Sequence, residues 1–373
     1  MKIRPISFSF MMATAVFLAS CSGGSVAFSL PEGDTIPLTH ARNLTMVRYD
    51  AFTKVELVNP WDATGLLATY LLVEDSATLD KTLLNDSRVQ IVRVPLRNAL
   101  VFTAVHCGLI CELGKEPCIG GVCESQYIQC LTQPVVDCGS GSSPNHERIM
   151  QLRPDAMIVS PFENQTGNDK LARLGIPIIQ GAEYMEPTAL GRAEWMKFYG
   201  LLVGAEAEAH NLFRMVELRY DSLKATAAQL KEKPVIFTDK PYGNVWYQPG
   251  AESSAARLYA DAGAAIAFPE YRKSGSVPLS VEQVYSRVHD ADRWLFICHT
   301  PTQPTLAMLA DESDIYTRFK AFQTGQVWVC NTATSDFFES SPFHPDRLLS
   351  DILQICHAQQ SDTLSLYYYQ QLK

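Results

Sequence analysis

The pattern of apolar and polar positions changes its period along the chain. Between residues 44 and 61 apolar and polar residues alternate, and short apolar runs follow at 70–73 and 89–94. Strict alternation and short apolar runs are typical of β-strands. We therefore expect a small β layer over residues 44–95.

After Pro95 the pattern becomes one of helices alternating with short, fully apolar strands. The expected helices are Phe102–Leu113, Asn145–Leu152 and Asp169–Leu174, and the expected strands are Ala156–Val159 and Ile176–Ile179. Short buried strands that alternate with helices predict βα units and a mainly parallel sheet. Residues 96–187 are thus expected to form a first α/β lobe.

A long helical pattern separates this lobe from the next. It runs from Thr188 to Lys233, begins after Pro187, is divided at Gly204 and is ended by Pro234. The 29 residues after Gly204 would span about 43 Å as a helix, which is roughly the length of a domain.

A second βα series follows the helical tract. Its expected strands are Val235–Thr238, Trp294–Cys298 and Val327–Val329, and its expected helices are Glu252–Ala262, Ser280–His289, Pro304–Phe322 and Pro345–His357. We expect a second lobe over residues 234–360 and a C-terminal tail over 361–373. The predicted fold class is α/β, with two parallel-sheet lobes joined by a long helix over 188–233.

The two lobes also share a short motif. Glu147 stands eight residues before Asp155 and an apolar strand, and Glu282 stands eight residues before Asp290 and another apolar strand. The repeat suggests two equivalent halves related by a pseudo-twofold axis.

The N-terminus has the pattern of an export signal. Lys2 and Arg4 precede an apolar stretch that is too short to be a stop-transfer helix. The stretch ends in Leu-Ala-Ser before Cys21, which resembles the bacterial lipobox, in which the cysteine is lipidated. We expect a signal peptide over 1–20, lipidation of Cys21 and a tether over 21–43; the alternative is ordinary signal cleavage with Cys21 incidental.

The composition and net charge of the chain reduce the number of functional classes that fit it. The 373 residues include 31 Lys and Arg against 40 Asp and Glu, which gives a net charge of −9. Removal of residues 1–20, which carry two basic and no acidic residues, lowers the charge by two, to −11. Nucleic-acid binding calls for a basic surface, so that class of partner is not expected.

Six of the ten cysteines crowd into residues 107–138. They are Cys107, Cys111, Cys118, Cys123, Cys130 and Cys138. In an exported protein, disulfides or buried thiols are the leading interpretation, and the pairing cannot be deduced from spacing. A metal site is the alternative, although no pair of C-x2-C knuckles is present.

Three stretches resemble a known family. They are 145–155 (N-H-E-R-I to L-R-P-D), 279–284 (L-S-V-E-Q-V) and 334–342 (T-S-D-F-F-E with S-P). Together they resemble the substrate-binding proteins of iron-complex and vitamin B12 ABC importers. The run 187–195 is similar to a lipoprotein branch of that family.

This resemblance implies two Rossmann-like lobes joined by one rigid helix, with the ligand held between the lobes. It also implies that Glu147 and Glu282, one on each lobe, dock onto a dimeric ABC permease in the inner membrane. One carboxylate on each of two equivalent lobes would fix the orientation of the protein on a two-fold symmetric partner. The alternative is that both glutamates are ordinary solvent-exposed helix residues. The expected location is the periplasm, as a membrane-anchored lipoprotein of the cell envelope.

Ligands of parallel α/β lobes lie beyond the carboxyl ends of the strands, so the loops after strands hold the candidate residues. The candidate ligand-binding residues are His106, Tyr127, Phe162, Tyr242, Trp246, Phe337 and Phe338. Such an aromatic wall favours a flat or bulky ligand: haem, cobalamin or an iron chelate. Each aromatic side chain suits a lobe core equally well, and a structural role is the commoner one for a lone histidine such as His106.

No catalytic site, cofactor or resident metal site is expected. Cys298 and His299 are neighbours on a predicted strand, so their side chains point to opposite faces. Phosphate-binding loops and the common hydrolase motifs are missing from the sequence. The alternative functions are a cysteine-dependent metal-binding or redox protein that uses residues 107–138, and a surface scavenger that serves an outer-membrane receptor.

Overall fold

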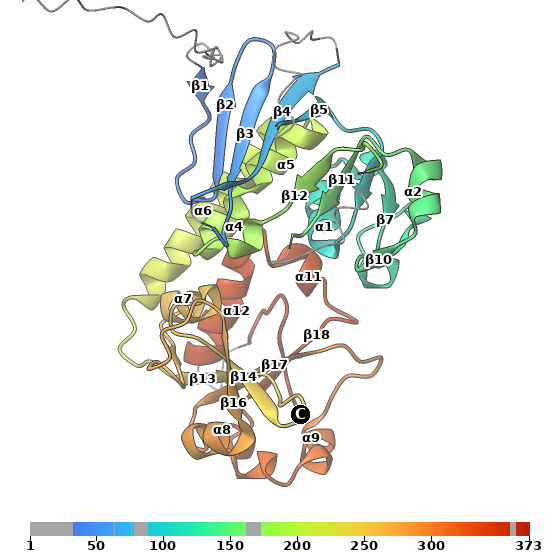
Figure 1. The fold of residues 1–373 in the computed structure, drawn as a ribbon. Helices are drawn as coiled ribbons and strands as arrows, with labels where there is room; N and C mark the ends of the chain where they lie inside the picture. Colours follow the sequence, from blue (N-terminus) through green and yellow to red (C-terminus); the bar gives the residue numbers. More distant parts are fainter. Residues whose placement is uncertain (1–32, 63, 76, 78–88, 162–172, 359–362) are drawn as a thin grey trace, which may run out of the picture. The chain divides into compact units, whose positions relative to one another are not determined.

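The computed structural model (Figure 1) describes residues 33–62, 64–75, 77, 89–161, 173–358 and 363–373. Cys21, Phe162, the predicted signal peptide and most of the predicted helix Asp169–Leu174 lie outside the described residues. Residues Gly33–Lys373 form a compact unit of their own. Within the described ranges, no helix has the length and apolar character needed to cross a bilayer.

A five-stranded sheet comes first, in the order β1-β2-β3-β4-β5. Its strands are β1 (Asp34–Thr35), β2 (Leu44–Arg48), β3 (Thr53–Val58), β4 (Leu66–Glu74) and β5 (Val89–Val94). Every second residue of β3 is buried, as the alternating sequence predicts. This sheet is the expected N-terminal β extension.

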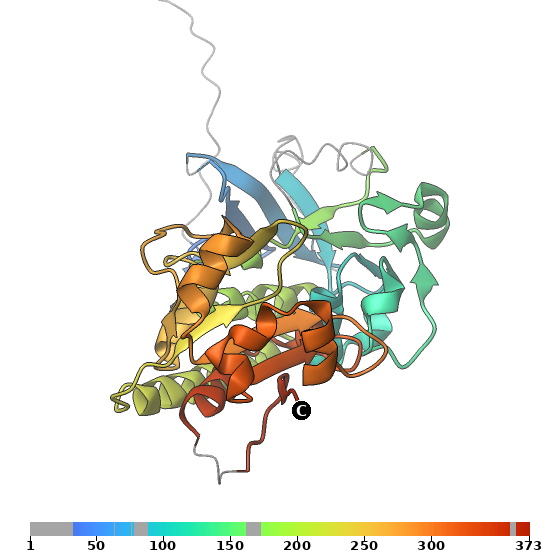
Figure 2. The same cartoon turned by 90° about the horizontal axis from the view of Figure 1, so that it is seen from below.

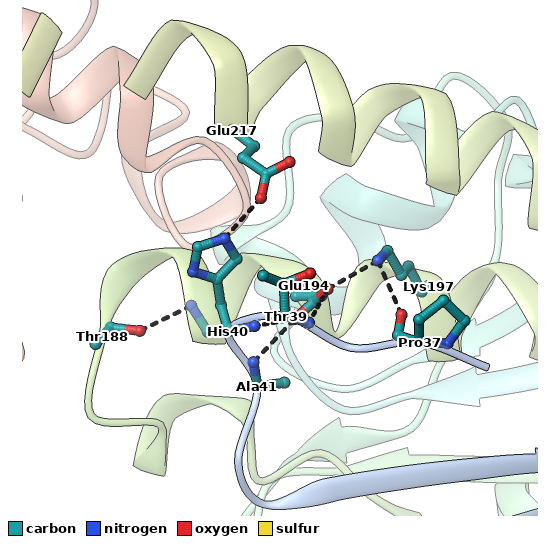
Figure 3. A network of polar contacts seen from close by, with 9 residues as sticks. Pro37, Thr39, His40, Ala41, Thr188, Glu194, Lys197 and Glu217 are labelled. Atoms are coloured by element: carbon teal, nitrogen blue, oxygen red, sulfur yellow. Dashed lines mark hydrogen bonds and ion pairs between the residues drawn. The ribbon is translucent and has the colours of Figure 1, made fainter. Parts of the chain in front are cut away.

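The segment between β1 and β2 lies against helix α4 (Ala189–Glu194), as Figure 3 shows. The carboxylate of Glu194 accepts hydrogen bonds from the backbone amides of residues 39–41, and Glu186 accepts from those of 42–43. These residues were expected to belong to a tether. They are instead attached to the fold, because two carboxylates satisfy their backbone donors.

Lobe 1 is built on a parallel sheet in the order β12-β11-β6-β7-β8. Its strands are β6 (Ala99–Val101), β7 (Ile119–Val122), β8 (Val136–Asp137), β11 (Ala156–Val159) and β12 (Ile178–Gln180). Helices α1 (Ala104–Glu112) and α2 (His146–Leu152) and a small hairpin of β9 (Gly139–Ser140) with β10 (Ser143–Pro144) complete the described part of this lobe.

Lobe 2 is built on a sheet in the order β15-β13-β17-β18-β19. Its strands are β13 (Val235–Thr238), β15 (Ala265–Ile266), β17 (Arg293–Cys298), β18 (Val327–Asn331) and β19 (Gln370–Gln371). Its helices are α7 (Ser254–Asp261), α8 (Val281–Val288), α9 (Leu306–Glu312), α10 (Lys320–Gln323), α11 (Phe337–Ser340) and α12 (Pro345–His357). A hairpin of β14 (Val245–Pro249) and β16 (Ser276–Ser280) was not expected from the sequence.

The two sheets repeat one strand order. Without the edge strands β8 and β19, lobe 1 has the order β7-β6-β11-β12 and lobe 2 has the order β15-β13-β17-β18. In each of these sets the first strand in sequence lies between the second and the third, and the fourth lies beyond the third. Asp155 accepts hydrogen bonds from the amides that lead into β6, and Asp292 accepts one from the amide of Val235 at the start of β13. The equivalent of Asp155 is therefore Asp292, not Asp290 as the sequence motif suggested.

The helical tract consists of α4, α5 (Met196–Val203) and α6 (Glu206–Ala227), drawn in yellow-green in Figures 1 and 2. Gly204 ends α5 with a φ of 66°, a left-handed conformation that suits glycine. The division at Gly204 is confirmed. The longest helix in the described part of the chain, α6, ends at Ala227 rather than continuing to Lys233, so its 22 residues span about 33 Å instead of the expected 43 Å.

Two other expectations need correction. The single helix expected over 304–322 is broken into α9, a 3-10 turn and α10, because the polar residues after Glu312 favour non-helical backbone. The expected C-terminal tail contributes β19 to the edge of the lobe 2 sheet, and Tyr368, Tyr369 and Leu372 are buried there.

Candidate ligand site between the lobes

Loops that follow strands of the two lobes touch each other. Tyr127 ends a 3-10 helix, η3 (Ser125–Tyr127), that follows β7, and His299 directly follows β17. Their rings meet edge to face, with centroids 5.5 Å apart. The Nε2 amide of Gln129 donates to the carbonyl oxygen of Thr332, which follows β18 (3.3 Å). The carboxyl ends of strands from both lobes therefore converge at this contact, where ligands of α/β folds bind.

His299 is exposed but held in place. Its Nδ1 lies 3.0 Å from the Oγ1 of Thr332, and that hydroxyl donates to the carbonyl oxygen of Cys298 (3.1 Å). The ring therefore presents its Nε2 edge from a fixed position.

An apolar pocket of about 240 Å³ opens beside the ends of β13 and β17. Its walls include Tyr247, Ile297 and Phe337, and Asp239 is among its polar lining residues. Asp239 has a φ of 59°, and burial raises the pKa of its carboxyl. A pocket of this size accepts one arm of a large ligand rather than the whole, since drug-sized ligands fill 300 Å³ or more.

A second cavity, of about 350 Å³, lies where α1 meets α11 and α12. The buried carboxylate of Glu339 on α11 accepts hydrogen bonds from the backbone amides of Gln129 (2.7 Å) and Cys130 (3.0 Å) of lobe 1. His344 at the start of α12 contacts Glu112 of α1 at 2.7 Å. Burial by itself would lower the pKa of His344, but Asp346 and Glu112 outweigh it and raise the pKa. Glu339 and His344 of lobe 2 thus satisfy backbone donors and pair with a carboxylate of lobe 1.

The seven candidate residues fall into three groups. Tyr127, Tyr242 and Phe338 are exposed, and Phe337 lines the lobe 2 pocket. Phe162 lies outside the described residues. The other two, His106 and Trp246, have no exposed surface.

His106 is a core residue and not a ligand contact. Its Nδ1 lies 2.8 Å from Thr103 Oγ1, and its Nε2 lies 2.9 Å from the hydroxyl of Tyr199 and 3.4 Å from Glu183. Both ring nitrogens are therefore occupied inside the protein.

Trp246 is also a core residue. It lies on β14, packs against the rings of Phe237, Trp294 and Phe319, and donates from Nε1 to the carbonyl oxygen of Thr238 (2.8 Å). The next residue, Tyr247, points the other way and lines the pocket, because side chains alternate along a strand.

Glu147 and Glu282 occupy equivalent positions. Each is the second residue of a helix, α2 or α8, whose first turn is capped by a side chain: Asn145 in one case and Ser280 in the other. Both glutamates are exposed. A carboxylate in the first turn is also favourable toward the helix dipole.

The cysteines of 107–138 do not converge on one point. Cys107 and Cys118 lie in the core shared with the N-terminal sheet, and Cys123 and Cys138 lie in a separate core of lobe 1. Burial raises the pKa of these four thiols, to about 11 for Cys118, so they favour the protonated form, which is a poor metal ligand. In the part of the chain that the structure describes, no three His, Cys, Asp or Glu side chains form a group able to hold a metal ion.

Cys111 and Cys130 form a closer pair. Both line the 350 Å³ cavity between α1 and α11. A hydrogen bond between the two side chains raises the pKa of Cys130 and lowers that of Cys111.

Comparison with known proteins agrees with this arrangement. An uncharacterized lipoprotein of Methanocaldococcus jannaschii is 24% identical over 95% of this chain and 93% of its own length. A periplasmic heme binding protein from Pseudomonas aeruginosa has a similar fold, with a TM-score of 0.59 and 16% identity over 74% of this chain and 98% of that one. A siderophore binding protein from Vibrio cholerae, solved with Fe3+-Desferal, has a TM-score of 0.52 and 20% identity over 70% of this chain and all of that one.

The match that defines the family covers the residues just described. The family model for periplasmic binding proteins matches residues 114–334, more than half of the chain. This range includes the lobe 1 sheet from β7 onward, the helical tract and most of lobe 2. The chain belongs to the periplasmic binding protein family.

Proposed function

We propose that this chain is an extracytoplasmic lipoprotein, anchored through Cys21, that binds an iron chelate, haem or a cobalamin-like ligand between its lobes and delivers it to an ABC permease. The observation that carries the proposal is the contact between Tyr127 and His299, which brings the strand ends of both lobes to one place. The aromatic side chains and the apolar pocket of lobe 2, whose wall includes Ile297 two residues before His299, suit a large, partly flat ligand. Two proteins of similar fold, a heme binding protein and a siderophore binding protein, support the same ligand class.

A calorimetric titration of the chain without residues 1–21 tests the binding step. Residues Gly33–Lys373 form one compact unit, so the shortened chain retains the whole described fold. We expect saturable binding, with a dissociation constant below about 1 μM, of one chelate among hemin, cyanocobalamin and a panel of ferric siderophores. Zinc and inorganic phosphate serve as controls. If none of the chelates binds, or if only a bare ion does, the proposal is wrong.

Docking onto the permease is tested by reversing two charges. The double variant Glu147→Arg and Glu282→Arg should lower ligand uptake by cells at least about tenfold, since close charge pairs in interfaces contribute about 1.5 kcal/mol or more. Ligand affinity should be unchanged, because both side chains are exposed and neither lines the 240 Å³ pocket or the 350 Å³ cavity.

A matched control carries the same change of charge elsewhere. Glu208 and Glu232 are also exposed, on and just after α6, so the double variant Glu208→Arg and Glu232→Arg should import ligand at the normal rate. Equal uptake by both double variants would rule out docking through Glu147 and Glu282.

A further inference from the structure

His106 and His299 each come after a strand of a lobe sheet, near the carboxyl end of that strand, but their surroundings differ. His106, after β6, is buried and has a partner at each ring nitrogen. His299, after β17, is exposed; its Nδ1 contacts Thr332, and its ring makes a T-shaped contact with the ring of Tyr127 from the other lobe. The two positions therefore have different chemical uses.

The partners of Thr332 determine the tautomer of His299. The Thr332 hydroxyl has one proton, and it lies 3.1 Å from the Cys298 carbonyl oxygen, which can only accept. Both contacts of the hydroxyl are hydrogen bonds only when it donates to that carbonyl and accepts from His299 Nδ1–H. A neutral imidazole protonated at Nδ1 carries its lone pair on Nε2.

Thr332 is itself well supported. Its backbone amide donates to the same Cys298 carbonyl (2.9 Å), and its own carbonyl oxygen accepts from Gln129 of lobe 1 (3.3 Å). A histidine whose second nitrogen is fixed by an oriented hydrogen-bond partner is the arrangement that proteins use to present an imidazole to a metal.

The geometry points to His299 Nε2 as an axial ligand of the metal in the bound chelate, oriented by Thr332. This inference rests on the proposed function and narrows it, because axial ligation needs a metal with an exchangeable axial position. Tetrapyrrole chelates such as haem and cobinamide have one, whereas a hexadentate ferric siderophore has all six positions filled. On binding, the Nε2 lone pair forms the bond to the metal, a weakly held water leaves it, and the proton on Nδ1 stays in place.

Titrations of the wild-type chain and three variants with hemin and with diaquocobinamide test this inference. Wild type should bind one of the two with the visible-absorption change of imidazole ligation. His299→Ala should lose that spectrum and bind at least about tenfold more weakly, and added imidazole should restore the spectrum. Thr332→Val keeps the shape of the side chain but removes the hydroxyl, so affinity should fall about tenfold with the ligation spectrum weakened.

The third variant is a matched control. His289 is also exposed, but it lies at the end of α8, and His289→Ala should bind like wild type. Circular dichroism before each titration establishes that the variants are folded; loss of the exposed His299 ring should not affect folding.

The outcomes separate the two ideas. If wild type binds no chelate, the proposed function fails and this inference fails with it. If wild type binds hemin or diaquocobinamide and His299→Ala binds it equally tightly with the same spectrum, only the inference is overturned. Tight binding of ferric desferrioxamine that His299→Ala leaves unchanged, without binding of either tetrapyrrole, would also overturn the inference while the function stands.

Discussion

Replacing Glu194 with alanine is expected to lower the free energy of unfolding by about 3–5 kcal/mol, the usual loss when one partner of a buried ion pair is removed. The Glu194 side chain has no exposed surface, and its carboxylate pairs with Lys197 at 2.7 Å (Figure 3). The same carboxylate accepts hydrogen bonds from the three backbone amides of residues 39–41. The substitution leaves a buried ammonium and three amide donors without this acceptor. Denaturant unfolding curves measure the loss.

The pH dependence of stability provides an independent test of the role of Glu194. Burial by itself would raise the pKa of Glu194, but hydrogen bonds from Lys197 and from the amides of residues 39–41 outweigh it and hold the pKa below its ordinary value. A lowered carboxyl pKa stabilises the fold above the pKa of the unfolded chain, about 4.3, and that stability is lost as pH falls further. The gap in stability between wild type and Glu194→Gln should therefore be full at pH 7 and shrink below about pH 4.

A surface glutamate provides the control. Glu56 forms a partly exposed ion pair with Lys54, two residues earlier on β3. Glu56→Ala should lower the free energy of unfolding by less than about 1 kcal/mol. A loss of that small size for Glu194→Ala would mean that residues 39–41 are not held by Glu194 as described.

Gly108→Ala should destabilise the chain by about 1–3 kcal/mol, the range for overpacking a tight contact. The sign is informative, because alanine inside a helix is normally more stable than glycine by up to about 1 kcal/mol. A Cβ on Gly108 of α1 would lie 2.5 Å from the carbonyl oxygen and 2.8 Å from the Cβ of Glu339 on α11. Backbone must move to make room, and Glu339 holds the amides of Gln129 and Cys130.

Thermal and denaturant unfolding of Gly108→Ala and Gly275→Ala make the comparison. No atom lies within 4 Å of the Cβ that Gly275 would gain, so that variant should stay within about 0.5 kcal/mol of wild type. A Gly108→Ala variant more stable than wild type would contradict the close approach of the two helices.

Local sequence patterns predicted most of the fold, because the spacing of apolar residues and the helix-ending Gly and Pro residues act over only a few positions. The strand Ala156–Val159 and the helix Pro345–His357 were predicted to the residue, and the division at Gly204 follows from one backbone conformation. The β14–β16 hairpin was missed because its strands pair across 26 intervening residues, among them α7.

The site was harder to predict than the fold. The rule that ligands lie beyond strand ends selects loops, but it does not say which way a side chain points. His106 is turned inward by Tyr199 and Glu183, residues more than seventy positions away in sequence. The same rule also selects His299, which follows the predicted strand Trp294–Cys298, but the partner that orients it, Thr332, is visible only in the structure.

The burial of the indole rings has an optical consequence. Trp195, Trp246 and Trp294 have no exposed surface, and Trp328 has almost none. A ligand between the lobes cannot touch these rings, so direct quenching by contact is excluded and resonance energy transfer is the main route left. Transfer requires a ligand that absorbs where indole emits, as a tetrapyrrole does strongly. The fluorescence of these four indoles, out of the five tryptophans of the chain, therefore depends on the absorption spectrum of the ligand more than on contact with it.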